Sequence, residues 1–165
     1  MPVQFLIDWI KRALDRRLLV VVVPQKEEIM DWVRQAIGQI KEPVDWLTLA
    51  ASDNLPPSFQ AHLAAVMNKL ALDGRLGSFD PPEQNEGLED WIVSLINWAA
   101  DWRVDRVLVI DNYTIIVAAE IHRAIALLID FLPPHLHVIL ITQGEPPLPL
   151  GHWRVRRQVA EINLM

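Results

Sequence analysis

The chain has 165 residues, of which 52% are hydrophobic and 22% charged, and this composition indicates one globular domain, residues 1–165, with a buried core. Its formal net charge of −6 argues against a nucleic-acid-binding surface, because such a surface needs clustered lysine and arginine. The absence of cysteine excludes disulfides, thiolate metal sites and cysteine nucleophiles.

The N-terminus and the hydropathy predict a cytoplasmic protein. Asp8 and Lys11 interrupt the first apolar segment, so we expect no signal peptide. No segment approaches the roughly 20 apolar residues that a membrane-spanning helix needs. We therefore expect no membrane partner.

The first half of the chain predicts helices and strands in alternation. In chain order these are a helix over 4–16, a strand over 18–23, a helix over 27–40, a strand over 44–51 and a helix over 58–72. The uninterrupted aliphatic residues of 18–23 are typical of a central parallel strand that is covered on both faces. We expect the glycine- and proline-containing segment 73–87 to be a mobile connection.

The second half continues the alternation. It predicts a helix over 88–102, a strand over 106–111, a helix over 118–131, a strand over 137–142, a short basic helix over 152–158 and a last strand over 159–164. Strands that alternate with helices form right-handed crossovers, so the predicted fold class is α/β with a mainly parallel sheet.

One strand end carries a candidate metal ligand. In VLVID the aliphatic strand ends at Asp111, which is where P-loop NTPases place the acidic residue that holds the magnesium shell. By itself this is a weak signal, because many α/β sheets place an aspartate at a strand end.

Longer motifs raise the specificity of this signal. Asp111 and Tyr113 are followed by Ile121-His122, then by LPPHLHVILIT and PPLPL, and then by Arg154, Arg156 and Gln158, while VDWLTLAASDN lies upstream. In this order, over nearly the whole chain, the motifs resemble the ATPase domain of the STAND class, as found in the MalT/LuxR-type large regulators. The resemblance implies a P-loop NTPase-like three-layer domain with a five-stranded sheet in the order 5-1-4-3-2. It also implies a switch driven by Mg-ATP.

The phosphate loop of that family, A-P-A-G-x-G-K-T-T, is not matched. After the first strand the chain has only Pro24, Gln25 and Lys26, followed by Glu27 and Glu28. Without glycines no nest of backbone N–H groups can surround a phosphate, and the two glutamates add charge that repels it. Lys26 is either a displaced remnant of the loop or, as we favour, a solvated surface charge.

Two further departures concern the same site. Where the family has paired aspartates the chain has Asp111-Asn112, and where the family has an arginine after the fourth strand the chain has Gln143, following Thr142. Each change replaces a charged group with an amide and lowers the affinity for metal or phosphate. We therefore predict a degenerate nucleotide site, with no catalytic residue, no metal and no cofactor, at Pro24, Gln25, Lys26, Asp111, Asn112, Thr142 and Gln143.

Two groups of residues are candidates for an interface. Trp91, Trp98 and Trp102 either cover the sheet as core or include exposed anchors for a partner. The basic residues of the short helix, Arg154, Arg156 and Arg157, are too few to bind nucleic acid, and we expect them to contact carboxylates within the chain or on another subunit. His135 and His137 lack further donors for a metal set.

The function predicted first is a non-catalytic pseudo-ATPase domain that acts as a regulatory, adaptor or oligomerisation module in signalling. A protein partner or self-association follows from the resemblance. One alternative is a domain that still binds Mg-ATP through Lys26, Asp111 and Thr142. A second alternative is a self-assembling structural protein. The chain is either a small subunit or a fragment of a larger regulator.

Overall fold

The computed structural model describes residues 2–71, 77–80 and 86–165. Its centre is one sheet of five parallel strands in the order β2-β3-β4-β1-β5. The strands are β1 (Leu18–Val22), β2 (Val44–Thr48), β3 (Arg106–Asp111), β4 (Leu136–Thr142) and β5 (Val159–Asn163). Read from the other edge this is the predicted order 5-1-4-3-2, so the predicted fold is confirmed.

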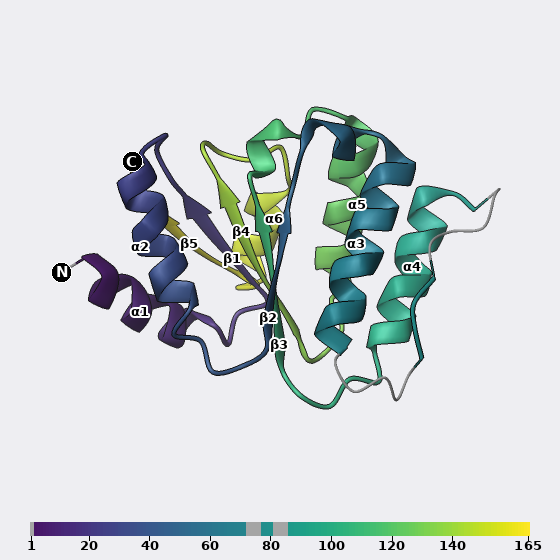
Figure 1. Ribbon diagram of the computed structural model, residues 1–165, viewed down its shortest axis with the longest axis horizontal. Coiled ribbons are helices and arrows are strands. Elements are labelled where there is room, and N and C mark those ends of the chain that lie inside the picture. The colour runs from purple at the N-terminus through teal and green to yellow at the C-terminus, as the bar shows by residue number, and fades with distance from the viewer. Residues whose placement is uncertain (1, 72–76, 81–85) are drawn as a thin grey trace.

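Helices cover both faces of the sheet (Figure 1). One face carries α1 (Pro2–Ala13) and α2 (Glu27–Ile37). The other carries α3 (Pro56–Ala71), α4 (Leu88–Ala99), α5 (Ala119–Asp130) and the short α6 (Leu150–Val155). No helix within the described ranges has both the length and the apolar character needed to cross a membrane.

The aliphatic strand β1 supplies core to both faces. Leu18 and Val20 pack into the core under α3 to α6, whereas Leu19 and Val21 pack under α1 and α2. All four side chains are at most 1% exposed. A strand with neighbours on both edges and helices on both faces leaves no position for a polar side chain, which explains the uninterrupted aliphatic run.

Two of the wrong predicted boundaries have local causes. The helix predicted to reach residue 40 ends at Ile37, where Gly38 follows. The strand predicted over 44–51 ends at Thr48, because Asp53 Oδ2 accepts the N–H of Ala50 at 2.8 Å and begins the 3-10 turn η1 (Ala51–Asn54). The turn η2 (Tyr113–Ile115) after β3 was not predicted.

The short basic helix also differs from its prediction. It begins at Leu150 and ends at Val155, whereas 152–158 was predicted. Arg157 has φ of 56°, a left-handed conformation that ends the helix, and the N–H of Gln158 then bonds to Trp153 O at 2.9 Å. Of the predicted mobile connection, 73–76 and 81–85 lie outside the described residues.

Candidate functional site

A cavity of about 480 Å³ lies at the edge of the sheet where the parallel strands end. Its walls are the β1–α2 loop, the first turns of α2, and the carboxyl ends of β2, β3 and β4. In open α/β sheets this edge is where ligands bind. The cavity brings together all the residues predicted for the degenerate nucleotide site: Pro24, Gln25, Lys26, Asp111, Asn112, Thr142 and Gln143.

The β1–α2 loop, residues 23–26, offers few backbone donors to the cavity. The N–H of Val23 donates to Thr142 O at 2.8 Å, and the N–H of Lys26 donates to Pro24 O at 2.8 Å. Pro24 has no N–H. Only Gln25 keeps a backbone N–H that neither the loop nor β4 uses, so the loop cannot form the ring of amides that holds a phosphate.

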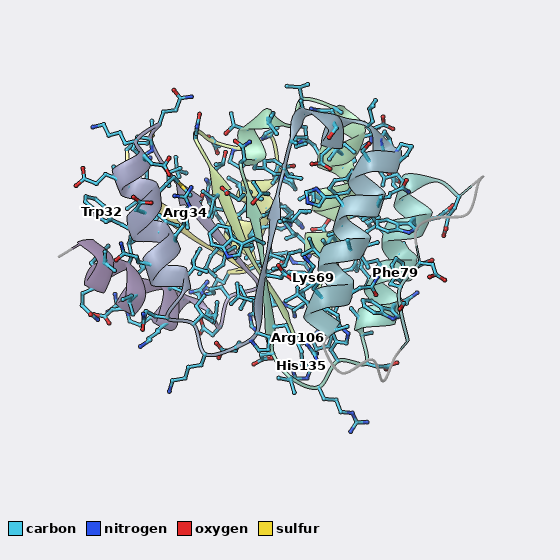
Figure 2. The ribbon with its side chains drawn as sticks, in the orientation of Figure 1. Trp32, Arg34, Lys69, Phe79, Arg106 and His135 are labelled. Carbon is cyan, nitrogen blue, oxygen red and sulfur yellow. The ribbon has the colours of Figure 1, made fainter. Side chains whose placement is uncertain are left out.

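An ion pair within α2 places a carboxylate in the same cavity. Arg34 Nη1 lies 2.7 Å from Glu27 Oε1 and 3.0 Å from Asp31 Oδ1. The hydrogen bond to Glu27 is the main cause that raises the pKa of Arg34. The carboxylates of Glu27 and Asp31 therefore already neutralise the guanidinium of Arg34. Figure 2 labels Arg34 on α2.

Arg34 was missed by the sequence analysis, although a signal existed. Glu27, Asp31 and Arg34 are separated by four and three residues, and on a helix this spacing places all three on one face. The glutamates were considered only for their charge at the start of the helix. Their possible partner two turns further on, Arg34, was not considered.

Asp111 and Asn112 are tied to the backbone around the end of β3. Asp111 is half-buried, and its Oδ1 accepts the N–H of Asn112 at 2.7 Å. Burial raises the pKa of the Asp111 carboxyl above its ordinary value. Asn112 has φ of 60°. Its side-chain Nδ2 donates to Leu49 O at 3.0 Å, so the amide joins the end of β3 to the segment after β2.

Side-chain hydrogen bonds hold the end of β4 in place. The Thr142 hydroxyl donates to Gly144 O at 3.0 Å, and Thr114 Oγ1 accepts the N–H of Gln143 at 2.9 Å. Gln25 Nε2 then donates to Gln143 Oε1 at 3.1 Å and links the β1–α2 loop to β4. Thr114 was not predicted, because nothing in the local sequence relates it to Gln143.

These residues do not fit the Mg-ATP that the family resemblance implies. The cavity wall has two cations, Lys26 and Arg34, and two carboxylates, Glu27 and Asp111. A polyanion with its magnesium needs several backbone donors, a free cation and an available metal ligand. Here the loop keeps one free backbone N–H, that of Gln25, and Glu27 already holds one of the two cations, Arg34.

Of the two interpretations of the tryptophans, core is confirmed and exposed anchor is wrong for Trp91 and Trp102. They are 1% and 4% exposed and belong to the core beneath α3 to α6. Trp98 is half-buried, with its ring centroid 5.6 Å from that of Trp102 and 5.3 Å from that of Phe79. The apolar surface of α4 is wide because it packs on its own chain, which is the alternative that the sequence left open.

The three arginines near α6 have different surroundings. Arg154 forms the predicted contact to carboxylates inside the chain, 2.6 Å from Glu161 and 3.4 Å from Glu145, and the hydrogen bond to Glu161 is the main cause that raises its pKa. Arg156 Nη1 lies 3.4 Å from His152 Nε2. Arg157 contributes its carbonyl, which accepts a hydrogen bond from Arg16 Nη1 at 2.9 Å.

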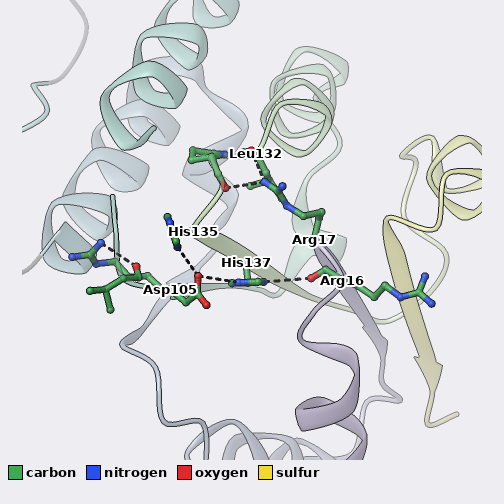
Figure 3. Close-up of polar contacts among 9 residues, drawn as sticks. Arg16, Arg17, Asp105, Leu132, His135 and His137 are labelled. Carbon is green, nitrogen blue, oxygen red and sulfur yellow. Dashed lines mark hydrogen bonds and ion pairs between the residues drawn. The ribbon is translucent and has the colours of Figure 1, made fainter. Parts of the chain in front are cut away.

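A second polar cluster lies at the opposite end of the sheet (Figure 3). Asp105 Oδ1 lies 2.8 Å from His135 Nδ1 and 3.7 Å from His137 Nε2. The hydrogen bond from His135 is the main cause that lowers the pKa of Asp105. Arg17 Nη2 donates to Leu132 O and, at 2.8 Å, to Pro133 O. The cluster joins three chain connections.

Comparisons with known proteins relate the chain to a group of regulators. A scan of protein-family models finds no match. The HTH-type transcriptional regulator MalT of Serratia proteamaculans (strain 568) is 31% identical over 125 residues, which is 74% of this chain and 14% of MalT. MalT of Cronobacter sakazakii is 30% identical over 125 residues, and MalT of Yersinia enterocolitica is 30% identical over 122. The chain thus spans 13% to 14% of the length of these relatives.

Two solved structures share the fold. A chain in the structure of Drosophila ORC bound to AT-rich DNA and Cdc6 matches with a TM-score of 0.53 and 9% identity, over 98% of this chain and 56% of that one. A Walker-type ATPase of Pyrococcus abyssi matches with a TM-score of 0.56 and 10% identity, over 85% of this chain and 44% of that one. At this level of identity the likeness is one of fold alone.

Proposed function

Because this chain belongs, over the matched residues, to the MalT-type group of STAND P-loop NTPase regulators, we propose that it is a regulatory domain that neither binds nor hydrolyses ATP. In this proposal the nucleotide-binding fold is kept as a rigid body for protein contacts, to a partner or to further copies of itself. The phosphate site is lost.

The β1–α2 loop is the observation that carries this proposal. In a working phosphate loop several successive backbone N–H groups point at the phosphate, and the helix that follows adds the positive end of its dipole. Here the N–H groups of Val23 and Lys26 are bonded to carbonyls of the protein, and Pro24 has none. Of the loop's own N–H groups only that of Gln25 is left for a phosphate, where a working phosphate loop offers several.

The charges around the loop also lower the affinity for a phosphate. Glu27 and Glu28 lie in the first turn of α2, where a carboxylate stabilises the helix by about 0.3–1 kcal/mol. This is the position that a phosphate would occupy. Glu27 also holds Arg34, the second cation of the cavity, at 2.7 Å. A phosphate would have to compete with this carboxylate for the arginine.

The size of the cavity supports one alternative, a domain that still binds Mg-ATP. A volume of about 480 Å³ lies within the usual range for small-molecule sites, and Lys26, Asp111 and Thr142 all line it. On this alternative Lys26 would meet the phosphates and Asp111 would hold magnesium. To donate to a phosphate, the Thr142 hydroxyl would have to give up its bond to Gly144 O.

An equilibrium titration with a fluorescent ATP analogue in magnesium buffer separates the two functions. We expect no saturable binding in the micromolar range, and the same result for the Asp111→Ala variant. Micromolar binding by the natural chain that Asp111→Ala abolishes would establish the alternative. A phosphate-release assay on the same samples tests hydrolysis directly, and the expected rate equals that of the buffer.

A further inference from the structure

Strand β2 forms one edge of the sheet, and part of its backbone faces outward. It pairs only with β3, in parallel. The N–H of Val107 bonds to Pro43 O at 2.8 Å, and the N–H of Leu49 bonds to Asp111 O at 3.0 Å. Along a strand the backbone groups of alternate residues face the same neighbour, so those of the odd-numbered residues of β2 face β3. The N–H and C=O groups of Val44, Trp46 and Thr48 therefore point away from the sheet.

One of these outward groups is covered by the chain itself. Asp45 Oδ1 accepts the N–H of Trp46 at 2.8 Å. A charged side chain that folds over an edge strand is a common protection against uncontrolled pairing of sheets. The N–H groups of Val44 and Thr48 have no such cover among the described residues, so the protection of the edge is partial.

A groove of about 420 Å³ runs along the edge on the side of α2. Apolar side chains, among them Ile37, Ile40 and Trp46, line it together with the charged residues Arg34 and Glu42. Val44 and Trp46 are half-buried there, against the core under α1 and α2. This groove can accept an apolar side chain that comes from a segment lying along β2.

A second groove, of about 410 Å³, flanks the same edge on the side of α3. Two charged residues, Asp45 and Lys69, line it together with Pro43 and Leu70. Figure 2 labels Lys69 on α3 and Arg34 on α2, with β2 between the two helices. The two grooves thus lie on opposite faces of one strand edge.

We propose that the β2 edge binds an extended segment of a partner protein, which adds to the sheet as a sixth strand beside the five. Only an extended backbone can pair with the outward groups of a strand, and its side chains point alternately to the two faces. The grooves on opposite faces of β2 match this alternation. The segment places apolar side chains toward Ile37 and Trp46 and polar side chains toward Lys69, where a carboxylate matches the ammonium.

A partner segment fits this edge better than a second copy of the chain. Two β2 edges in contact would bring together two Asp45 carboxylates, both of which lie over the edge. Like charges that face each other across paired strands are destabilising. The inference goes beyond the proposed function, because it does not depend on whether the cavity at the strand ends holds a nucleotide.

Peptide selection followed by amide hydrogen exchange tests the inference. The probe is a displayed library of random dodecapeptides, selected on the immobilised chain without nucleotide. We expect enriched peptides with alternating apolar and polar residues, and we expect the best one to slow exchange of the Val44 and Thr48 amides at least tenfold. Selection that enriches no alternating peptide, or peptides that leave both amides unprotected, would overturn the proposal.

Three variants make the result specific to the edge. Ile40→Arg fills the groove beside α2 and is expected to lower peptide affinity at least tenfold, whereas Val93→Arg, on α4 and 45% exposed, should not change it. Asp45→Ala releases the N–H of Trp46 and should raise the affinity severalfold. If Asp45→Ala instead forms dimers without peptide in sedimentation, the occupant is a second copy and the proposal is wrong.

Discussion

Removing the carboxylate of Asp130 should loosen the short helix α6 from the body of the domain. Trp153 is fully buried, and its indole Nε1 donates to Asp130 Oδ1 at 2.7 Å, which joins α6 to α5. An isolated helix of this length is not stable in water, so packing and this hydrogen bond hold it. In Asp130→Ala the indole N–H stays buried and loses its acceptor.

The size of the effect follows from the kind of bond that is lost. A hydrogen bond to a charged group contributes about 1.5–3 kcal/mol, and a buried donor without a partner costs a similar amount. Urea unfolding of small domains has a slope of about 1–3 kcal/mol per molar. With values in the middle of both ranges, Asp130→Ala should lower the urea midpoint by about 1 M.

Far-UV circular dichroism in urea measures this midpoint, and a double-mutant cycle with Trp153→Phe isolates the hydrogen bond. Phenylalanine keeps an aromatic ring at the position and removes the donor. In the Trp153→Phe background, Asp130→Ala should therefore cost much less than in the natural chain. Equal costs in the two backgrounds would refute the role given to this bond.

The remaining predictions concern the cavity at the strand ends. Asn112→Gly should be more stable than Asn112→Ala by about 1 kcal/mol in thermal unfolding, because both lose the bond to Leu49 O but only alanine is strained at φ of 60°; equal stabilities would contradict this. Burial raises the folded-state pKa of Asp111, so its ionised form destabilises the fold. Asp111→Asn should therefore be more stable than the natural chain at pH 7, and this difference in stability should disappear as the pH falls toward 3.8. A difference in stability that does not change with pH would count against this reasoning. Glu27→Gln with Glu28→Gln should still not bind the fluorescent ATP analogue, because the loop still has only one free backbone N–H, that of Gln25; micromolar binding by this variant would mean that charge alone closes the site.

Much of the fold could be predicted because its signals are local. The aliphatic run of β1 and the helical spacing of apolar residues in α2 are set by which faces are buried, and this is visible in the sequence. The motifs around Asp111 and LPPHLH then fixed the strand order through a family resemblance. Boundaries were less accurate, because ends such as that of α6 depend on the conformation of a single residue, here Arg157.

The loss of the loop's glycines, and the positions of Asp111, Thr142 and Gln143 at strand ends, could be read from the amino-acid sequence. The ion pair between Glu27 and Arg34 in the same cavity, the burial of Trp91, and the edge of β2 between two grooves became visible in the folded chain. Strand ends and missing glycines follow from neighbours along the chain, whereas ion pairs, burial and open edges depend on which distant elements pack together.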